Sequence, residues 1–559
     1  MRKGEAAFIM FLFLFVSFCV IGTTIQYLGV RSDKTTRLVV GQTEICVEIL
    51  EPDGGRKGSI VLMHGIIGSR RMVKPLATDI VRAGWRVVLV DQIGHGDSGG
   101  RYSLNYSEIR KPIVALCRLI NESEDFRRGL IEYVRRLAGG EPIIFGGHSF
   151  GALLAILMSQ ECDGLLNTVG TFAIAPPFVE VVNVSEVKNL LLCLGKYDEF
   201  IPVSDLKRYV DPENPDMVPV GKTIGDFRNG TARRIYVSPY SDHVFEPYDP
   251  AIAEEIIRWL DMCIGLPPGR VIPLLVLFSV IKALGSLFGL VAVAMLPIAL
   301  ADKLGIISGG KRFPTMRLVG VSLVASCIVW PMLTMIFLAI FFAGILSVAR
   351  VLGYIMPVLI GGYVLVASIA LVASSSYLAG RSVKSTLAKI YLYLRSDIAR
   401  NLLLGVLEAA LFLVVLEVSF GDILAPMIPR TAGRIAISIL LAMMIFGYFI
   451  FHEHFFRAQI QEIFGGRRRR AVVFSILISL LSKIVVIVAI TGLILLLSPF
   501  PVVATVGMLG MILVALLTEG LAATSYYATR EILPHSIASA IVWASVVSAA
   551  FPVVSIALI

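Results

Sequence analysis

The sequence predicts a two-part architecture: a doubly wound, mostly parallel α/β domain followed by an all-α transmembrane helix bundle. Residues 31 to about 268 alternate short β-branched runs with amphipathic segments, which is the pattern of a parallel sheet covered by helices on both faces. Residues 271–559 are mostly long apolar runs. The chain is 56% hydrophobic, with a mean hydropathy of +0.80, whereas soluble globular proteins are about 45 to 50% apolar.

Four segments follow from these patterns. Arg2 and Lys3 precede an apolar run that continues to about Leu28. We interpret this run as an uncleaved anchor helix, with a cleaved signal peptide as the alternative. The chain then divides into an N-terminal transmembrane anchor (1–30), the α/β domain (31–264), a linker (265–274) and a polytopic membrane domain of about eight helices (275–559).

The elements of the α/β domain are expected in a regular order, beginning with a hairpin over 38–50. Each later strand is a short, mostly aliphatic run, which is typical of a strand buried on both faces. The expected strands lie at 59–63, 86–90, 143–145, 171–175, 190–194 and 234–237. The expected helices between and after them lie at 72–83, 126–137, 152–158 and 252–262.

A serine flanked by glycines, Ser149, lies between the expected strand 143–145 and the helix that follows it. Gly147 and Gly151 stand two residues to either side, where a sharp strand-to-helix turn leaves no room for a side chain. Such a turn lifts the serine hydroxyl above the sheet, at a helix N-terminus that favours a developing oxyanion. Ser149 is therefore the predicted nucleophile.

A second serine, Ser98, also fits the pattern G-x-S-x-G. The residues after it, Gly99, Gly100 and Arg101, form a loop sequence and do not begin a packed helix. The pattern alone is weak evidence without the strand and helix around it. We therefore expect Ser98 to be structural.

Four further motifs accompany the serine turn in the same part of the chain. They are His64-Gly65, the run DQIGHGDS at 91–98, the run GKYDEFIP at 195–202 and the run DHVFEP at 242–247. With these motifs in this order, residues 37–262 resemble the α/β-hydrolase family of esterases, lipases and some peptidases. Many members carry Arg where this chain has Ile93, which leaves the chemistry intact but loosens the subfamily assignment.

The resemblance implies a catalytic triad in the order serine, acid, histidine. A serine hydroxyl needs a neighbouring imidazole to accept its proton, and a carboxylate must orient that imidazole. Only His243 follows Ser149 within the α/β domain, so it is the predicted base. Asp198 follows the strand after the serine turn and is the predicted acid, with Glu199, Asp226 and Asp242 as weaker candidates and a surface carboxylate as the alternative interpretation.

The oxyanion requires two backbone N–H donors. Phe150, the residue after the nucleophile, supplies one, and the resemblance implies Ile66 as the second. His64 and His148 are expected to hold loops by hydrogen bonds. No cofactor or metal is expected, because Cys46, Cys117, Cys162, Cys193 and Cys263 are widely spaced without a CxxC pair; one disulfide is possible, with its partners open.

Two short insertions bear on specificity. The segment 176–187 carries Phe178 and several valines, and a small apolar cap of this kind favours an acyl chain as the bound group. The alternative is that these side chains simply pack on the sheet. The second insertion, 209–231, is rich in Pro, Asp and Asn.

The membrane domain is predicted from apolar runs of about 20 residues, the length that a bilayer requires. They lie at roughly 275–300, 318–347, 351–375, 402–420, 435–451, 472–497, 502–528 and 537–559. Among the charged residues within them, Lys483 and Glu519 are expected at similar depth, as are Lys282 and Glu417. Each pair could be an ion pair or, less simply, part of a proton or substrate path.

The orientation follows from the distribution of Lys and Arg. If the N-terminus is cytoplasmic, the short outer loops contain only Arg350, Arg430 and Arg434. The inner loops contain fifteen basic residues, which are Lys303, Lys311, Arg312, Arg317, Arg381, Lys384, Lys389, Arg395, Arg400, Arg457, Arg467 to Arg470 and Arg530. This places the α/β domain outside the cytoplasm, in agreement with sequons at Asn105, Asn121, Asn183 and Asn229.

The sequence thus predicts a multi-pass membrane protein whose α/β domain is a serine hydrolase. Its expected partners are a small-molecule ester or lipid substrate and the membrane lipids. No nucleic acid is expected, because the basic residues behind the net charge of +9 concentrate between apolar spans. A peptidase or acyltransferase with the same triad, or a transporter or receptor with a ligand-binding hydrolase-like domain, remain alternatives, and the oligomeric state is open.

Overall fold

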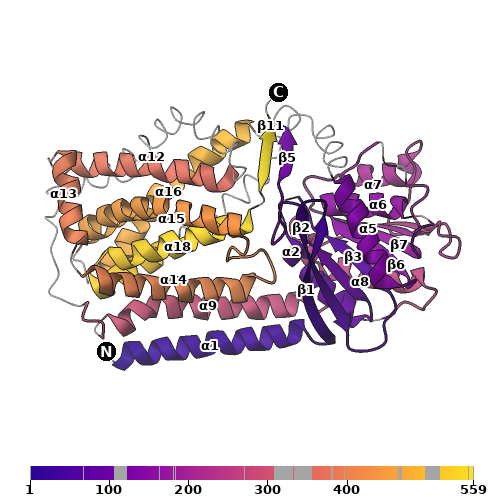
Figure 1. The fold of residues 1–559 in the computed structure, drawn as a ribbon, viewed down its shortest axis with the longest axis horizontal. Helices are drawn as coiled ribbons and strands as arrows, with labels where there is room; N and C mark the ends of the chain where they lie inside the picture. The colour runs from indigo at the N-terminus through magenta and orange to yellow at the C-terminus, as the bar shows by residue number, and fades with distance from the viewer. Residues whose placement is uncertain are drawn as a thin grey trace. The chain divides into compact units, whose positions relative to one another are not determined.

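The structure is a computed structural model, shown in Figure 1. It describes residues 2–105, 123–306, 355–497 and 516–557, together with Met332 and apart from 67, 163, 181, 183, 270, 302, 379, 381, 396, 463, 465–468 and 552. Two compact units form within it. The α/β unit contains Phe18–Leu284 with two short segments, Val418–Pro426 and Ala550–Ile559, and the helical unit contains the remainder.

The α/β unit is built on a nine-stranded sheet with the order β1-β2-β4-β3-β6-β7-β8-β10-β9. Six neighbouring strands, β4 to β10 in that order, run parallel, and β1, β2 and β9 pair antiparallel at the edges. The strands are β1 (Val30–Val40), β2 (Thr43–Pro52), β3 (Ser59–Met63), β4 (Arg86–Val90), β6 (Ile143–His148), β7 (Thr168–Ile174), β8 (Leu190–Gly195), β9 (Thr223–Ile224) and β10 (Arg233–Ser238).

Helices cover both faces of this sheet (Figure 1). Helices α2 (Arg70–Arg82) and α8 (Pro250–Cys263) pack together on one face, and α5 (Glu124–Ala138) and α6 (Phe150–Glu161) pack together on the other. A short helix, α7 (Val203–Val210), follows β8. Every residue of β3, β4, β6 and β8 is buried, because both faces of a doubly wound sheet are covered. The predicted α/β class is confirmed.

The segment 91–98 forms a buried loop that is held by a charge network. Arg70 on α2 pairs with Asp91, Asp97 and Glu48, and its backbone N–H donates to Asp91 Oδ1 at 2.7 Å. Ser98 Oγ donates to the Asp91 carbonyl and accepts from the Cys46 N–H, both at 2.8 Å. Ser98 therefore joins β2 to this loop, and its hydroxyl is fully used for structure.

The two short segments of the α/β unit are held to it by hydrogen bonds to their backbone groups. Arg71 donates to the Gly421 carbonyl at 2.7 Å, and Tyr248 donates to the Ile423 carbonyl at 2.5 Å. Strand β11 (Val554–Ala557) pairs in parallel with β5 (Tyr102–Asn105). The apolar run predicted at 537–559 therefore ends as a helix at Ala550, and a strand replaces its last part.

Several helices, most of them long and apolar, lie wholly or partly in the helical unit. They are α1 (Arg2–Gln26), α9 (Leu275–Leu300), α12 (Ile355–Leu378), α13 (Val383–Leu394), α14 (Ile398–Phe420), α15 (Ala432–Glu453), α16 (Arg469–Leu497) and α18 (Leu533–Ala550). Within the described residues, five helices are long and apolar enough to cross a membrane, namely Lys3–Gln26, Leu275–Leu300, Ile398–Phe420, Ala432–Gln461 and Leu533–Ala550. The run predicted at 318–347 lies outside the described residues.

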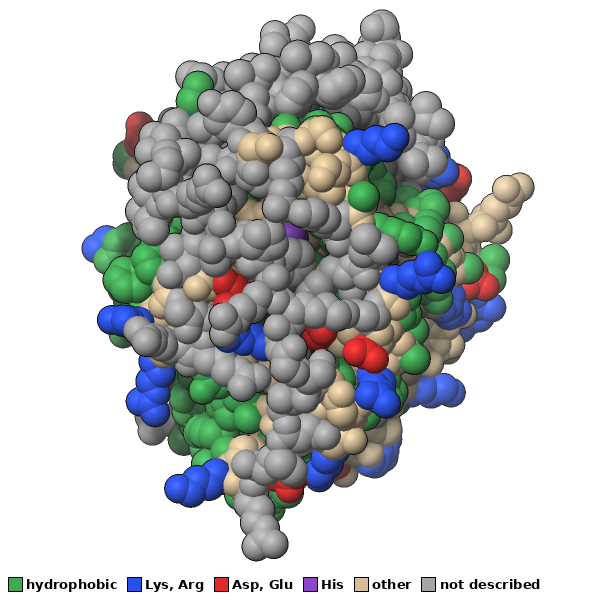
Figure 2. Space-filling view, turned by 90° about the vertical axis from the view of Figure 1, so that its left-hand side faces the viewer, with side chains coloured by type: hydrophobic (Ala, Val, Ile, Leu, Met, Phe, Trp, Pro, Cys, Tyr) green, Lys and Arg blue, Asp and Glu red, His purple; other side chains and the backbone are tan. Residues whose placement is uncertain are grey.

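These helices carry exposed apolar side chains. Ile9 and Phe13 on α1 are 64% and 68% exposed. Exposed apolar side chains of this kind need an apolar environment or a partner to cover them. In the view of Figure 2, hydrophobic side chains are visible in patches, and Lys and Arg side chains lie mostly near the margin.

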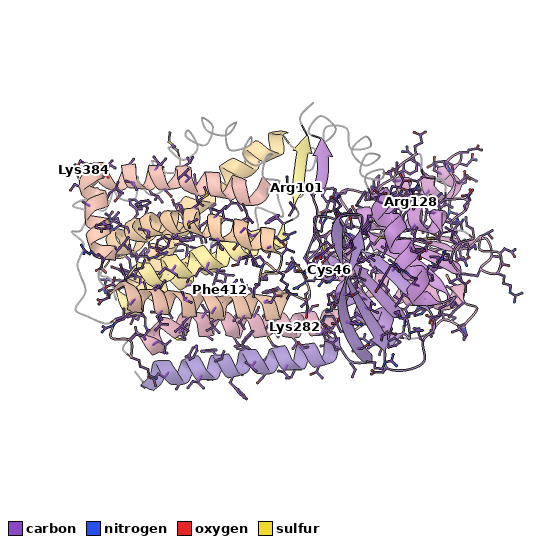
Figure 3. All side chains as sticks on the ribbon, in the orientation of Figure 1. Cys46, Arg101, Arg128, Lys282, Lys384 and Phe412 are labelled. Carbon is purple, nitrogen blue, oxygen red and sulfur yellow. The ribbon has the colours of Figure 1, made fainter. Side chains whose placement is uncertain are left out.

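One of the two expected intramembrane ion pairs forms. Lys483 pairs with Glu519, as the sequence predicts. Lys282, labelled in Figure 3, donates to the amide oxygen of Gln26, and Glu417 pairs with Arg430 at 2.6 Å. The pairing of Lys282 with Glu417 stays a prediction, because the two residues belong to different units.

Arg457 was predicted in a loop, and the structure places it in a buried π-helix, His454–Gln461. Its guanidinium pairs with Glu519 and with Glu453, the latter at 3.3 Å, and donates to Ser475 Oγ at 2.7 Å. Burial of this charge is tolerated because carboxylates and hydroxyls surround it.

Candidate active site

The backbone at Ser149 forms a sharp turn between β6 and α6. Ser149 has φ 54° and ψ −122°, a conformation that non-glycine residues rarely adopt. A Cβ on Gly147 would lie 2.2 Å from the Gly151 carbonyl oxygen, and a Cβ on Gly151 would lie 2.4 Å from the His64 carbonyl oxygen. Both glycines are therefore required by space, as the sequence predicts, and they hold Ser149 in its strained position.

The structure brings the three predicted triad residues together. His243 Nε2 lies 3.1 Å from Ser149 Oγ, and His243 Nδ1 lies 2.8 Å from Asp198 Oδ2. Asp198 follows β8 and His243 lies between β10 and α8, so both side chains come from the carboxyl ends of neighbouring parallel strands. This edge of an open α/β sheet is where such folds place their sites.

Asp198 is held as a carboxylate. Its other oxygen, Oδ1, accepts hydrogen bonds from the backbone N–H groups of Phe200 and Ile201 at 2.7 and 2.8 Å. Burial alone would raise the pKa of this carboxyl, but the hydrogen bond from His243 and those two N–H groups outweigh burial and lower it. An ionised Asp198 fixes the proton of His243 on Nδ1 and leaves Nε2 free to accept one.

The weaker acid candidates serve local structure. Asp242 Oδ1 accepts the N–H groups of Val244 and Phe245, both at 3.0 Å. Asp226 Oδ1 accepts the N–H of Arg228 at 2.7 Å in the second insertion. These bonds commit both carboxylates to their own turns.

The two predicted oxyanion donors belong to segments that border Ser149. Phe150 begins α6, and Ile66 lies in the loop after β3, where its carbonyl accepts from His95 Nε2 at 2.6 Å. A Cβ on Gly65 would lie 3.2 Å from Ser149 Cβ, so this loop lies against the nucleophile. The oxyanion role of Ile66 and Phe150 stays a prediction.

His64 and His148 form hydrogen bonds to loops. His64 Nε2 accepts from the Gln92 N–H at 3.1 Å, and His148 Nε2 donates to the His243 carbonyl at 2.9 Å. Burial, and then the neighbouring His243, lower the pKa of His148 to about 3. His148 is therefore neutral and supports the loop that carries the catalytic imidazole.

Sequence reasoning missed one residue of this site, Glu246. Its side chain is fully buried and its Oε2 lies 3.4 Å from His148 Nε2 and 4.0 Å from His243 Nδ1. The residue stands three positions after His243 in the run 242–247. That spacing was visible, but it gave no sign that the carboxyl turns inward.

Two groups of side chains in the described residues have the spacing of metal ligands. They are His148 with His243 and Glu246, and Cys46 with Asp91 and Asp97. The acids of the second group already bind Arg70, and His243 of the first already bonds Asp198 and Ser149. Both ring nitrogens of His243 and the two acids of the second group are thus engaged within the protein, whereas Glu246 Oε2 has no hydrogen-bond partner among the described residues.

The apolar cap packs inward. Val179, Val182 and Val184 are buried, and the Phe178 ring lies against the Tyr209 ring with centroids 5.1 Å apart. Tyr209 also donates to the Pro177 carbonyl at 2.7 Å. These contacts favour packing over acyl binding for these side chains, while Val181 lies outside the described residues.

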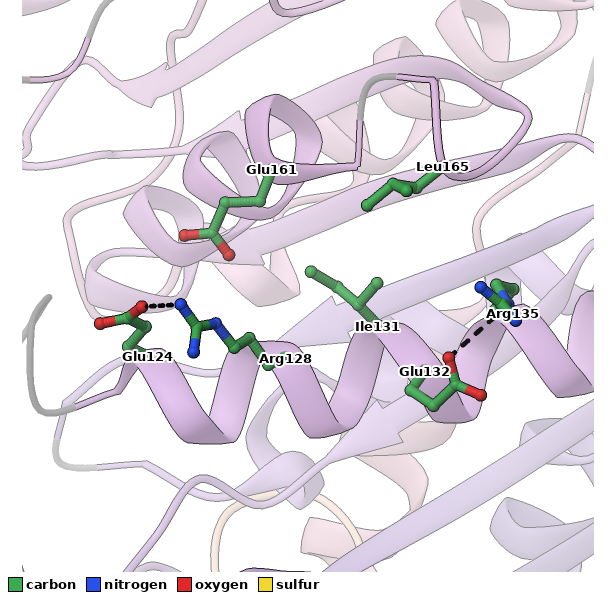
Figure 4. A pocket seen from close by; sticks show the side chains of 7 residues that line it. All are labelled: Glu124, Arg128, Ile131, Glu132, Arg135, Glu161 and Leu165. Atoms are coloured by element: carbon green, nitrogen blue, oxygen red, sulfur yellow. Dashed lines mark ion pairs between the residues drawn. The ribbon is translucent and has the colours of Figure 1, made fainter.

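A surface groove of about 420 Å³ lies between α5 and the end of α6 (Figure 4). Arg128 and Glu124 pair along α5, on one side of the groove. Since Ser149 precedes the first residue of α6 and Glu161 is the last, the groove lies at the opposite end of that helix from the nucleophile. It therefore has no part in the triad chemistry.

The fold and the assembled side chains define the class of this unit: an enzyme of the α/β-hydrolase type. Within it, residues 54–215 match the family described as serine aminopeptidase, S33. The matched segment contains Ser149 and Asp198 and ends before His243.

Similar solved structures include three hydrolases. A CIB-like hydrolase of Thermoplasma acidophilum shares 19% identity over 42% of this chain and 98% of its own, with a TM-score of 0.29. An esterase of Pyrococcus furiosus shares 16% identity over 42% of this chain and 94% of its own, with a TM-score of 0.30. An esterase of Thermogutta terrifontis shares 13% identity over 41% of this chain and 99% of its own, with a TM-score of 0.28. Similarities of this size say nothing about the substrate. Among curated proteins, none matches this chain.

Proposed function

We propose that this protein is a membrane-bound serine hydrolase that cleaves a carboxylic ester through an acyl-enzyme on Ser149. The observation that carries the proposal is the hydrogen-bonded chain from Ser149 Oγ through His243 to Asp198 Oδ2, at 3.1 and 2.8 Å. Ser149 lies on a strained turn at the N-terminus of α6.

Each step uses a group of this site. His243 Nε2 accepts the proton of Ser149 as its Oγ attacks the ester carbonyl, and the oxyanion accepts hydrogen bonds from the N–H groups of Phe150 and Ile66. His243 returns the proton to the departing alcohol, which leaves the acyl group on Ser149. Water then repeats both steps, releases the carboxylic acid and restores the serine.

The family match favours a second candidate, a serine aminopeptidase. An aminopeptidase would use the same triad on an amide and would also need an acidic group for the ammonium of the substrate. An acyltransferase would release the acyl group to an alcohol in place of water. Assays of nitrophenyl acyl esters against aminoacyl nitroanilides separate the first two, and added acceptor alcohol reveals the third.

The direct test is covalent labelling of the full-length protein in membranes with a fluorophosphonate. Native protein should be labelled, and Ser149→Ala and His243→Ala should not, because only an activated serine reacts at an appreciable rate. Ser98→Ala is the matched control and should retain labelling. A folded native protein that resists the probe would refute the hydrolase and favour a transporter or receptor with a ligand-binding domain.

Membrane insertion and an extracytoplasmic α/β unit are part of the same proposal. Support comes from the five apolar helices, the exposed Ile9 and Phe13 and the distribution of basic residues. The test pairs two exposed lysines, Lys34→Cys in β1 and Lys384→Cys in α13. An impermeant maleimide on intact cells should label the first and not the second, and the reverse result would invert the topology.

A further inference from the structure

A second buried carboxyl lies beside the triad. The Glu246 side chain is fully buried at the start of a short 3-10 helix, Glu246–Tyr248. Its Oε1 accepts the Gly195 N–H at 2.6 Å. This bond ties the loop of His243 to the end of β8, from which Asp198 follows.

The other oxygen of Glu246 has no hydrogen-bond donor among the described atoms. His148 Nε2 lies 3.4 Å away, but it donates to the His243 carbonyl. Asp198 Oδ2 lies 2.8 Å from His243 Nδ1, and Glu246 Oε2 lies 4.0 Å from the same nitrogen, so the two carboxyls face one imidazole. Two carboxylates cannot bond to each other, so a proton on one of them is needed to make this contact favourable.

The ionisable groups around Glu246 are of two kinds. Asp198 and Asp242 are acids that disfavour a second negative charge. His148 is neutral, Cys193 is a buried thiol whose pKa is raised well above the ordinary value, and His243 is the movable base. Burial first, and then Asp198, raise the pKa of Glu246 well above its ordinary range.

We propose that Glu246 is a positioning residue that stays protonated at neutral pH, donates to Asp198, and so fixes the Asp198–His243 pair without adding a second negative charge to it. The inference rests on the proposed triad function. It assigns opposite protonation states to the two carboxyls. Asp198 is ionised and accepts three hydrogen bonds, whereas Glu246 is protonated and neutral. Active sites that contain two acids often shift their pKa values apart, so that one acid is charged and the other is protonated at the same pH.

A proton on Glu246 removes a negative charge from the neighbourhood of the catalytic base, His243. An ionised Glu246 would put a second negative charge 4.0 Å from His243 Nδ1, and this charge would favour the imidazolium over the neutral imidazole that must accept the proton of Ser149. A neutral donor instead restrains Asp198 and leaves the imidazole free at neutral pH.

Glu246→Gln and Glu246→Ala separate these effects. A glutamine amide can accept from Gly195 and donate to Asp198, as the protonated acid does, whereas alanine does neither. The rate of fluorophosphonate labelling should be measured from pH 5 to 10 in both variants. Glu246→Gln should label within about threefold of native protein, with the acid limb of its profile unmoved, and Glu246→Ala should label at least about tenfold more slowly.

Three outcomes would overturn the inference. An acid limb that moves down by about one pH unit in Glu246→Gln would mean that the native carboxyl is charged. Equal slowing in both variants would mean that the neutral acid is not what matters. Native rates in Glu246→Ala would mean that Glu246 does not position the triad.

A second measurement does not depend on activity. The infrared spectrum of native protein at pH 7 minus that of Glu246→Gln should contain the carbonyl band of a protonated carboxyl. Glu255→Gln is the matched control, since Glu255 is also buried but pairs with Arg234 at 2.6 Å, and its difference spectrum should lack the band. A missing band in the Glu246 spectrum refutes the inference even if the protein is not labelled, while a band with no labelling refutes only the proposed hydrolase.

Discussion

Two regions of the molecule each contain an acid, a histidine and a serine joined at similar hydrogen-bond distances. In the α/β unit, Asp198, His243 and Ser149 are joined at 2.8 and 3.1 Å. In the helical unit, Glu408, His535 and Ser539 are joined at 3.0 and 2.8 Å. Hydrogen-bond distances alone do not distinguish a catalytic acid–histidine–serine set from a structural one.

The backbone and the exposure do distinguish them. Ser149 has a positive φ, precedes a helix and is partly exposed. Ser539 lies in the middle of α18 and is 3% exposed. Its N–H belongs to the helical ladder, so this N–H is not available to stabilise an oxyanion. Activation of a serine therefore depends on the turn that presents it, as much as on the imidazole.

The largest expected difference in labelling rate comes from replacing the acid in each of the two hydrogen-bonded sets. Asp198→Asn should slow labelling by roughly 10⁴-fold, because an amide no longer holds the proton of His243 on Nδ1. Glu408→Gln should leave the labelling rate within about twofold, since its imidazole serves no nucleophile. Labelling kinetics in membranes measure both, and a strong loss in Glu408→Gln would show that the helical chain takes part in the reaction.

The glycines of the turn give the next largest contrast. Gly147→Ala should lower the free energy of unfolding by about 2 to 3 kcal/mol and abolish labelling, because its Cβ would collide with the Gly151 carbonyl. Gly447→Ala on α15 meets nothing within 4 Å and should raise stability by about 0.5 to 1 kcal/mol. Thermal unfolding of both variants in detergent tests the opposite signs, and equal effects would contradict them.

A smaller effect is expected in the pH dependence of stability. Because the folded-state pKa of Glu246 is raised, the unfolded chain releases this proton above about pH 4.3 while the folded protein keeps it, so the contribution of Glu246 to stability is lost as pH rises. Glu246→Gln does not titrate, so its melting temperature should rise relative to that of native protein as the pH increases from 5 to 8. A constant difference in melting temperature across that range would argue against a raised pKa.

The sequence was sufficient for elements with a strong local pattern. The strands predicted at 59–63 and 86–90 match β3 and β4, because each is a short aliphatic run that fits only a buried strand. The pairing of β5 with β11 could not be predicted, since the two partners lie far apart in the chain and neither has a distinctive pattern.

The site shows the same division. Ser149, Asp198 and His243 could be found because each stands at a fixed place relative to a strand. Glu246 and Arg457 could not, because a charged residue near the end of an element looks the same in sequence whether it turns outward or inward. Only the packing around them shows that both are buried.

The smallest effect, and the sharpest test of the comparison, is expected from Ser539→Ala. Loss of its hydrogen bond to His535 should lower the free energy of unfolding by about 1 kcal/mol, with labelling unchanged. The informative background is Ser149→Ala, in which any residual labelling must come from another serine. If that residual labelling existed and vanished on adding Ser539→Ala, the helical unit would contain a second activated serine. If no residual labelling exists, the strained turn at Ser149 accounts for the reactivity, and the chain from Glu408 to Ser539 serves to satisfy buried polar groups between α14 and α18.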